Sequence, residues 1–436
     1  MSGGSAWTGA AVAAVTAGYA LFSRRLASTP VSAPMVFTGF GVLIGPIGLD
    51  VLDLGHDAGP VLTLIEAALA LLLFTDAATV HRRDLRTGGF LPLRLLAIGL
   101  PLSIGAGWLL GWSLIPGLTL WEFALLGAVL APTDAALGKT ACSSPRVPPL
   151  VRHGLNVESG LNDGLVLPFF LMFLAALPGT VASEEGAGGV FWRAVVVSTV
   201  VGLAFGWVGG WLLTLSRDRG WVTGEWQQVL VLAVAFCAYS VATAVDGSGF
   251  IATWMGGFAF GVALRKGEPA GGESAKEGPA DLAGYVAGLL GTLSFLVFGA
   301  VLLGPALEHL NWRIITYAVL SLTVVRMLPV ALALAGTGVR LPTVAYVGWF
   351  GPRGLASVVF GLLLVEEHVP GIELLGQVVA VTIGLSILLH GMSAPYLADR
   401  YGNWYDAAKA ATPDLREAQD TPEGAGKQHG GPRRLR

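Results

Sequence analysis

The sequence predicts an all-helical integral membrane protein. Of its 436 residues, 54% are hydrophobic and only 13% are charged, whereas water-soluble domains carry about 25% charged residues. The mean hydropathy is +0.68. Apolar runs of about 17 to 25 residues, the length that a helix needs to cross a bilayer, recur along the whole chain. There is too little polar sequence to cover a water-soluble core, so we expect the chain to cross a lipid bilayer repeatedly.

The apolar runs give the expected helices in order. We expect about thirteen transmembrane helices on this criterion. The first is expected to be a retained helix and not a signal peptide, because no positive charge precedes it and Arg24 and Arg25 follow it. The predicted ranges are 6–22, 31–50, 59–80, 88–112, 119–138, 154–177, 190–215, 225–245, 249–264, 282–306, 313–335, 341–364 and 374–397.

Basic residues concentrate in every second loop, which predicts the orientation. By the positive-inside rule these loops are cytoplasmic, so the N-terminus is expected outside the cell membrane and the C-terminus inside. We expect a transmembrane domain over 1–398 and a disordered cytoplasmic tail over 399–436, with a flexible linker over 267–280. The basic loop residues are Arg24, Arg25, Arg82, Arg83, Arg86, Lys139, Arg146, Arg152, Arg217, Arg219, Arg265, Lys266, Lys276 and Arg340.

Composition also excludes several classes of protein. A net charge of −3 argues against a nucleic-acid partner, which would require a basic face. The two cysteines, Cys142 and Cys237, lie in or beside apolar segments and predict neither a disulfide framework nor a thiolate metal site. The tryptophans are expected to be interfacial or packing residues, and no cofactor is expected.

Proline and glycine interrupt two predicted helices. The run 132–134 (PTD) breaks the fifth helix and the run 351–354 (GPRG) breaks the twelfth. If helices 1–6 and 8–13 form two inverted repeats, these breaks are equivalent. Paired interruptions of this kind mark an alternating-access site, where free backbone carbonyls and half-helix ends face an ion. A single proline in a membrane helix is often only a kink, so the pairing carries the inference.

The predicted sixth helix carries Glu158, Ser159, Asn162 and Asp163 in the run GLNVESGLNDG. A charged group at membrane depth costs about 3 kcal/mol or more, so Glu158 and Asp163 predict a functional site. At 100° per residue, Ser159 and Asp163 share one helix face, and Glu158 and Asn162 share the neighbouring face. A hydroxyl one turn from a carboxylate forms part of an oxygen cage for a monovalent cation.

The other charged residues in the predicted membrane spans need oppositely charged or hydrogen-bonding partners, or access to the membrane interface. Glu158 is suited to a buried ion pair with Arg353, although the two could instead reach separate interfaces. Arg326 is expected to pair with a carboxylate or a helix C-terminus. Glu122 lies near the end of a predicted span and is expected to extend towards the interface.

The run GLNVESGLNDG, together with APTDA, GPRG and LLHGMSAP, resembles the sodium/proton exchanger family of monovalent cation:proton antiporters, in its electroneutral NhaP-type branch. The resemblance covers residues 10–400 and implies an NhaA-like antiporter fold and a homodimer. It implies that Asp163 binds the cation or the proton in turn. It also implies that Ser159 and Thr133 supply further oxygens to the transported Na⁺, beside Asp134 in the interrupted helix.

The resemblance assigns supporting roles as well. Glu158 and Arg353 look like the structural ion pair of the family, with Asn162 as a polar partner. A third-helix carboxylate belongs to the site in some members, and Asp76 is the nearer match, with Glu66 as the alternative. The sequence departs from the family pattern at Gly160, where a larger apolar residue is expected.

These observations predict a transporter and not an enzyme. The expected function is exchange of Na⁺, or Li⁺ or K⁺, for H⁺ across the cell membrane, and Asn162 in place of a second aspartate favours electroneutral exchange. A K⁺/H⁺ antiporter of the same fold stays open as an alternative. An intramembrane hydrolase using Ser248 and His390 is disfavoured, because DGSGF lacks the spacing of a nucleophile elbow. A channel is disfavoured because no repeated filter is visible.

Overall fold

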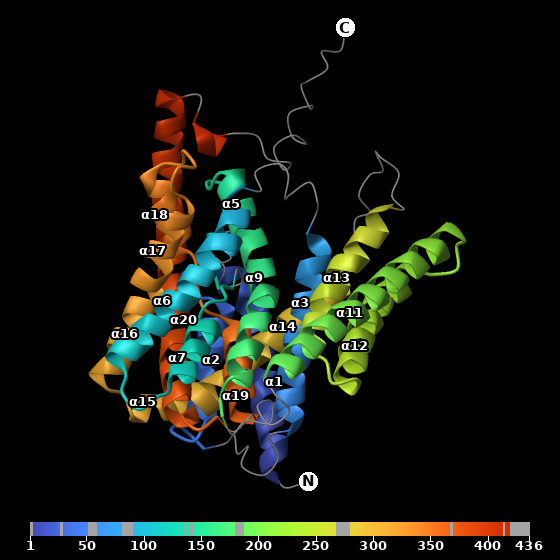
Figure 1. Ribbon diagram of the computed structural model, residues 1–436, viewed down its shortest axis with the longest axis horizontal. Helices are drawn as coiled ribbons and strands as arrows, with labels where there is room; N and C mark the ends of the chain where they lie inside the picture. The colour runs from blue at the N-terminus through green and yellow to red at the C-terminus, as the bar shows by residue number, and fades with distance from the viewer. Residues whose placement is uncertain are drawn as a thin grey trace.

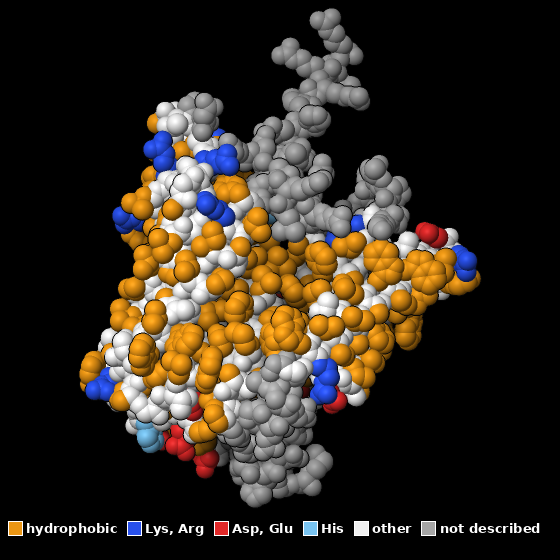
Figure 2. All heavy atoms as spheres, in the orientation of Figure 1, with side chains coloured by type: hydrophobic (Ala, Val, Ile, Leu, Met, Phe, Trp, Pro, Cys, Tyr) orange, Lys and Arg blue, Asp and Glu red, His pale blue; other side chains and the backbone are white. Residues whose placement is uncertain are grey.

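A computed structural model shows a bundle of helices that run side by side (Figure 1). It describes residues 3–26, 29–50, 59–80, 90–134, 137–138, 141, 144–178, 187–266, 280–366, 369–412 and 415–418. Every regular element in these residues is helical. Hydrophobic side chains cover the middle of the visible surface, and most visible charged side chains lie towards its ends (Figure 2). The predicted fold class is confirmed.

The helices follow the predicted apolar runs. Eight helical segments of the described chain are long and apolar enough to cross a membrane, so the number thirteen stays a prediction. The elements are α1 (Gly3–Leu26), α2 (Ala33–Ile44), α3 (Gly59–Thr79), α5 (Phe90–Arg94), the π-helical turn η1 (Leu95–Gly99), α6 (Leu100–Leu114), α7 (Leu120–Val129), α9 (Pro149–Ala175), α11 (Ala187–Asp218), α12 (Gly224–Ala244), α13 (Gly249–Lys266), α14 (Asp281–Phe298), the π-helical turn η2 (Gly299–Leu303), α15 (Gly304–Glu308), α16 (Trp312–Leu322), α17 (Val324–Ala333), α18 (Leu341–Trp349), α19 (Leu355–Glu366), α20 (Ile372–Ala411) and the 3-10 turn η3 (Arg416–Ala418).

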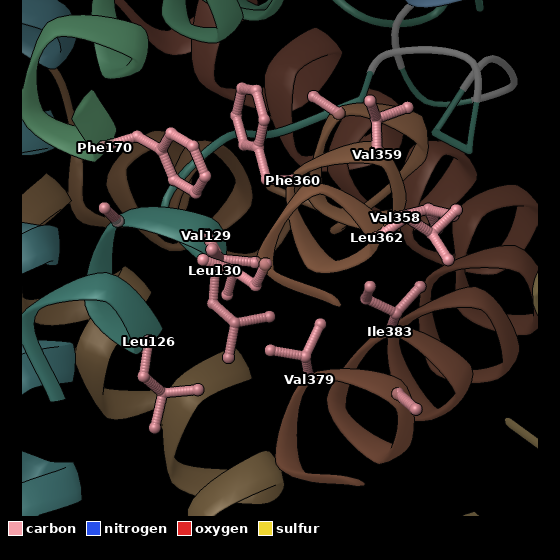
Figure 3. Packing of buried hydrophobic residues seen from close by; sticks show 14 of the residues in the cluster. Leu126, Val129, Leu130, Phe170, Val358, Val359, Phe360, Leu362, Val379 and Ile383 are labelled. Carbon is pink, nitrogen blue, oxygen red and sulfur yellow. The ribbon is translucent and has the colours of Figure 1, made fainter. Parts of the chain in front are cut away.

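Both predicted interruptions are present. Helix α7 ends at Val129, and residues 130–134 continue without helical structure. Residues 350–354 separate α18 from α19 in the same way. Beside these breaks lies a hydrophobic core of α7, α9, α19 and α20, in which the rings of Phe170 and Phe360 stack with their centroids 5.2 Å apart (Figure 3). Close packing of this kind fixes the position of the half-helices relative to α9.

Small residues bring the helices beside α3 into close contact. A Cβ atom at Gly206 of α11 would lie 2.0 Å from the carbonyl oxygen of Gly256 in α13, and one at Gly257 would lie 2.1 Å from the carbonyl oxygen of Phe74 in α3. Only glycine allows the backbones to approach this closely, as is common between membrane helices. This contact places α3, which carries Asp76, firmly against α13.

Glu122 is buried, so the expectation that it extends to an interface is wrong. Its Oε2 accepts a hydrogen bond from the backbone N–H of Thr119 at 2.6 Å, which forms a capping box at the start of α7. Its Oε1 accepts from the N–H of Gly371 at 2.6 Å, just before α20. The carboxylate therefore binds one backbone donor at the start of α7 and one just before α20, and so joins the two helices.

The C-terminal segment is more ordered than the sequence predicts. Helix α20 continues to Ala411, and Glu417 of η3 is fully buried. Its Oε1 accepts hydrogen bonds from the N–H of Arg340 and from Oγ1 of Thr343, both at 2.7 Å. These donors lie at the N-terminus of α18, where free N–H groups favour a carboxylate. Disorder is therefore wrong for 399–411 and 415–418, while 419–436 and the linker 267–279 lie outside the described residues.

We expect Glu417→Ala to destabilise the protein. The substitution leaves the N–H of Arg340 and the hydroxyl of Thr343 without their acceptor, which costs about 1–3 kcal/mol. The variant should melt at a lower temperature in detergent. Asp406→Ala, which removes an exposed carboxylate from the same end of α20, is the control and should melt like the parent. Equal melting temperatures for all three proteins would contradict the proposed cap.

Candidate functional site

The segments 130–134 and 350–354 of the two interrupted helices contact each other, and we call this contact the crossing. The N–H of Asp134 donates to the carbonyl oxygen of Pro352 at 2.8 Å. The Asp134 carboxylate accepts from the N–H of Leu355 at 3.1 Å, at the positive N-terminal end of α19. Gly354 makes this contact possible, because a Cβ atom there would lie 2.0 Å from Oδ2 of Asp134.

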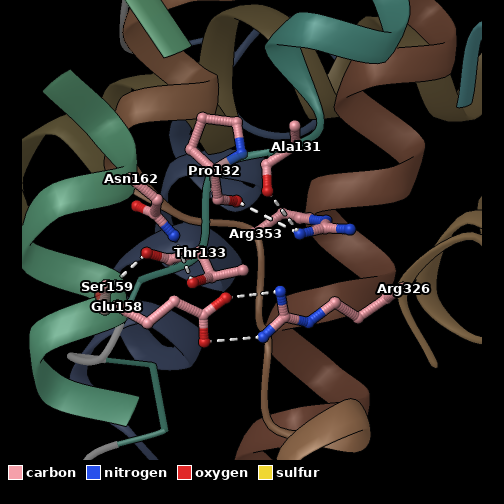
Figure 4. Close-up of polar contacts among 8 residues, drawn as sticks. All are labelled: Ala131, Pro132, Thr133, Glu158, Ser159, Asn162, Arg326 and Arg353. Carbon is pink, nitrogen blue, oxygen red and sulfur yellow. Dashed lines mark hydrogen bonds and ion pairs between the residues drawn. The ribbon is translucent and has the colours of Figure 1, made fainter. Parts of the chain in front are cut away.

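Arg353 supplies the complementary cap. Its side chain is fully buried, and Nη1 donates to the carbonyl oxygen of Ala131 at 2.9 Å and, more weakly, to that of Pro132 at 3.4 Å (Figure 4). The break in α7 leaves these carbonyls without helical donors, and lipid offers none. Each break is thus capped by a charged side chain from the other segment. The Asp134 carboxylate accepts from a backbone N–H, and the Arg353 guanidinium donates to two backbone carbonyls.

The polar residues of α9 divide between two faces, as the helical periodicity predicts. Ser159 and Asp163 line a cavity, whereas Glu158 and Asn162 are 2% and 1% exposed and contact neighbouring side chains. Nδ2 of Asn162 donates to Oγ1 of Thr133 at 2.6 Å, and Oγ of Ser159 donates to the Thr133 carbonyl at 2.8 Å (Figure 4). Both bonds tie α9 to the segment that follows α7.

Glu158 pairs with Arg326 of α17, not with Arg353. Nη1 and Nη2 of Arg326 donate to the two carboxylate oxygens at 2.6 and 2.9 Å, and both side chains are 3% exposed (Figure 4). The predicted Glu158–Arg353 pair is therefore wrong, because the carbonyls of Ala131 and Pro132 bind the guanidinium of Arg353. The prediction that Arg326 pairs with a carboxylate is confirmed.

A cavity of about 360 Å³ brings three carboxylates together. They come from Asp76 of α3, Asp134 of the crossing and Asp163 of α9. Oδ1 of Asp163 has no hydrogen-bond partner within the described part of the chain. Three carboxylates collected in one cavity at membrane depth favour a positive charge beside them, which a cation or protons can supply. The remaining lining residues are Leu72, Thr79, Val80, His153, Asn156, Val157, Ser159 and Gly160.

The structure separates the two candidate carboxylates of α3. Asp76 lies in the cavity wall. Glu66 lies ten residues earlier, about 15 Å along the helix, and accepts a hydrogen bond from the Tyr239 hydroxyl at 3.3 Å. Gly160 leaves room beside Asp76, since a Cβ atom there would lie 3.4 Å from the Asp76 Cβ, and a larger side chain would extend into this space.

Two further polar residues lie at the crossing but do not line the cavity. One of them, Thr133, was predicted from the sequence, and the other, Ser386, was not. Thr133 is 3% exposed, and its hydroxyl accepts from Asn162 instead of lining the cavity. Ser386 of α20 accepts a hydrogen bond from the backbone N–H of Arg353 at 2.7 Å. Sequence reasoning missed Ser386, because a single serine in an apolar helix carries no pattern that distinguishes it.

We expect Glu158→Ala and Arg326→Ala each to lower stability strongly. Either change leaves one charge of the pair buried alone, which typically costs about 3–5 kcal/mol. The double variant Glu158→Leu/Arg326→Leu removes both charges and should melt at a higher temperature than either single variant. Arg400→Ala, at an exposed position of α20, should behave like the parent. Single variants as stable as the parent in detergent would refute the pair.

Comparison with known proteins gives a consistent result. The family model described as "Sodium/hydrogen exchanger, transmembrane" matches residues 11–400. The K(+)/H(+) antiporter NhaP of Alkalimonas amylolytica is 27% identical over 84% of this chain and 62% of its own length. The Na(+)/H(+) antiporter 2 of Zygosaccharomyces rouxii is 25% identical over 74% of this chain and 41% of its own length. The chain therefore spans less than two thirds of these curated relatives.

A solved structure shares the fold. The sodium proton antiporter MjNhaP1 from Methanocaldococcus jannaschii at pH 8 superposes with a TM-score of 0.71. The alignment covers 92% of this chain and 98% of that chain, at 20% sequence identity. Together with the family model, which matches most of the sequence, this likeness confirms the resemblance inferred from the motifs. The chain belongs to the transmembrane sodium/hydrogen exchanger family.

Proposed function

We propose that this protein is a secondary antiporter that exchanges a monovalent cation, Na⁺ in the first instance, for H⁺ across the cell membrane. The observation that carries the proposal is the cavity in which Asp163, Asp76 and Asp134 meet beside two crossed half-helices. Crossed, interrupted helices with carboxylates at their break are suited to binding an ion at membrane depth. Membership of the exchanger family supports the same activity.

Coupling follows from competition for Asp163. Its carboxylate holds either a cation or a proton, and the empty charged form moves poorly because a bare carboxylate at membrane depth is costly. Ser159 and Asp76 contribute further oxygens from the cavity wall. Thr133 lies outside the cavity lining and supports this cage through its hydrogen bonds with Ser159 and Asn162. Asp134 faces the cavity and fixes the crossing at the same time.

We further propose that the cavity faces the cytoplasm in this structure. Thr79 and Val80 at the end of α3 and His153 at the start of α9 belong to its lining. Basic loops adjoin both ends in the sequence, and the positive-inside rule assigns such loops to the cytoplasm. The proposed orientation therefore has the N-terminus outside and the C-terminus inside. A homodimer is part of the proposal by resemblance to the family.

A K⁺/H⁺ exchanger is the second candidate. The name of the Alkalimonas amylolytica relative favours it, while the name of the Zygosaccharomyces rouxii relative favours Na⁺. Carboxylate and hydroxyl oxygens bind either ion, and the size and field strength of the cage decide between them. Proteoliposomes with an imposed pH gradient should show its collapse on addition of Na⁺, Li⁺ or K⁺. Failure of all three cations would refute the proposed activity.

We expect protons to compete with the cation at Asp163. The apparent affinity for the cation should fall as the pH is lowered, while the maximal rate at saturating cation changes little. Asp163→Asn keeps the shape of the side chain but cannot exchange a proton, so exchange should be lost. Asp406→Asn, on the exposed surface of α20, should exchange normally. Coupled exchange by a well-folded Asp163→Asn variant would refute the shared site.

We expect exchange to be electroneutral. Asn162 is a neutral residue that donates to Thr133, so Asp163 is the titratable member of the adjacent pair and one cation is exchanged for one proton. A membrane potential set by valinomycin in proteoliposomes should leave the Na⁺/H⁺ exchange rate unchanged at fixed ion and pH gradients. A clear dependence of the rate on potential would contradict one-for-one exchange.

A further inference from the structure

Helix α20 contacts the second interruption through side chains that do not line the cavity. Its residues Ser386 and His390 lie one turn apart, on one face of the helix, and both are fully buried. They contact the backbone on both sides of the break, at Trp349, the last residue of α18, and at Arg353. These two side chains have no place in the cation cage described above.

The contacts form a chain of hydrogen bonds that passes through the His390 ring. The backbone N–H of Arg353 donates to Oγ of Ser386 at 2.7 Å. Nδ1 of His390 lies 3.0 Å from the backbone carbonyl oxygen of Ser386 and 3.2 Å from its hydroxyl, which can donate its own proton to Nδ1. In that tautomer Nε2 carries the ring proton and donates to the carbonyl oxygen of Trp349 at 2.9 Å. The chain therefore runs from Arg353 through Ser386 and His390 to Trp349.

Both ends of this chain are backbone groups without a partner in α18 or α19, although the Trp349 carbonyl also accepts from the N–H of Gly351 at 2.8 Å. Trp349 is the last residue of α18, and Arg353 precedes the first turn of α19. The indole Nε1–H of Trp349 adds a third contact with α20, to Oγ of Ser393 at 2.9 Å. Between these ends lies Pro352, whose carbonyl accepts from the N–H of Asp134. A shift of either end would displace Pro352 and, with it, the cavity carboxylate of Asp134.

We propose that Ser386 and His390 are positioning residues for cation exchange. They fix both ends of the segment 350–354 against α20 and thereby set the place of Asp134 in the cavity. They touch no transported ion and act only through the crossing. The inference rests on the proposed exchange activity for its transport readout, and on the hydrogen bonds alone for its structural readout.

The transport test compares three substitutions in α20. Ser386→Ala and His390→Leu each break the chain and should raise the apparent KM for the cation about tenfold, with a smaller effect on the maximal rate. His390→Gln keeps an N–H that can reach the carbonyl of Trp349 and should recover part of the affinity that His390→Leu loses. A loss of folded protein alone would lower the maximal rate and leave the KM unchanged.

Thr382→Val is the matched control. Thr382 lies one turn before Ser386 and is equally buried, but its hydroxyl donates only within α20, to the carbonyl of Val378 at 2.7 Å. This variant should keep the parental KM. Parental KM values for both Ser386→Ala and His390→Leu would overturn the proposal, as would His390→Gln behaving no better than His390→Leu.

Hydrogen–deuterium exchange tests the same contacts without transport. In Ser386→Ala the N–H of Arg353 loses its acceptor, so a peptide that covers residues 349–356 should exchange faster than in the parent and in Thr382→Val. Unchanged exchange would overturn the proposal, even if His390→Leu fails to fold. Faster exchange in a protein whose parent transports no cation would support the structural contacts and refute the proposed activity instead.

Discussion

The fold depends on satisfying the backbone groups that two broken helices expose inside a membrane. A helix that ends there leaves N–H and C=O groups that lipid cannot bind, so the chain must supply partners. Here the two breaks supply partners to each other. Asp134 on the first segment accepts from the start of α19, and Arg353 on the second donates to the carbonyls that follow α7. Each charge also lies at the helix end whose dipole favours it.

This reciprocal capping explains how the charges around the site are distributed. Arg353 binds the carbonyls of the crossing, and Arg326 binds Glu158 through both carboxylate oxygens. Both buried guanidinium groups therefore have structural roles, and the cavity collects carboxylates from Asp76, Asp134 and Asp163. An acidic cavity beside firmly held cationic side chains is suited to a mobile cation or proton, because bound positive charge lowers the cost of burying the carboxylates.

The half-helix α18 is held at both of its ends by residues that follow it in the chain. Glu417 accepts hydrogen bonds at its N-terminus, and His390 donates to the carbonyl at its C-terminus. Glu122 similarly joins the start of α7 to the turn before α20. A short helix has little stability of its own, so such contacts determine where it lies. The geometry of the cavity consequently depends on residues far from it in sequence.

The sequence by itself determined the local features: the helices from apolar runs, the two breaks from proline and glycine, and the separate faces of α9 from the helical period. It could not determine partners. Arg326 lies 168 residues from Glu158, and no local pattern distinguishes it from Arg353. Burial of Glu122 and Glu417 depends likewise on distant backbone donors. Hydropathy and periodicity are properties of neighbouring residues, whereas the choice among several buried charges is made only when the helices pack.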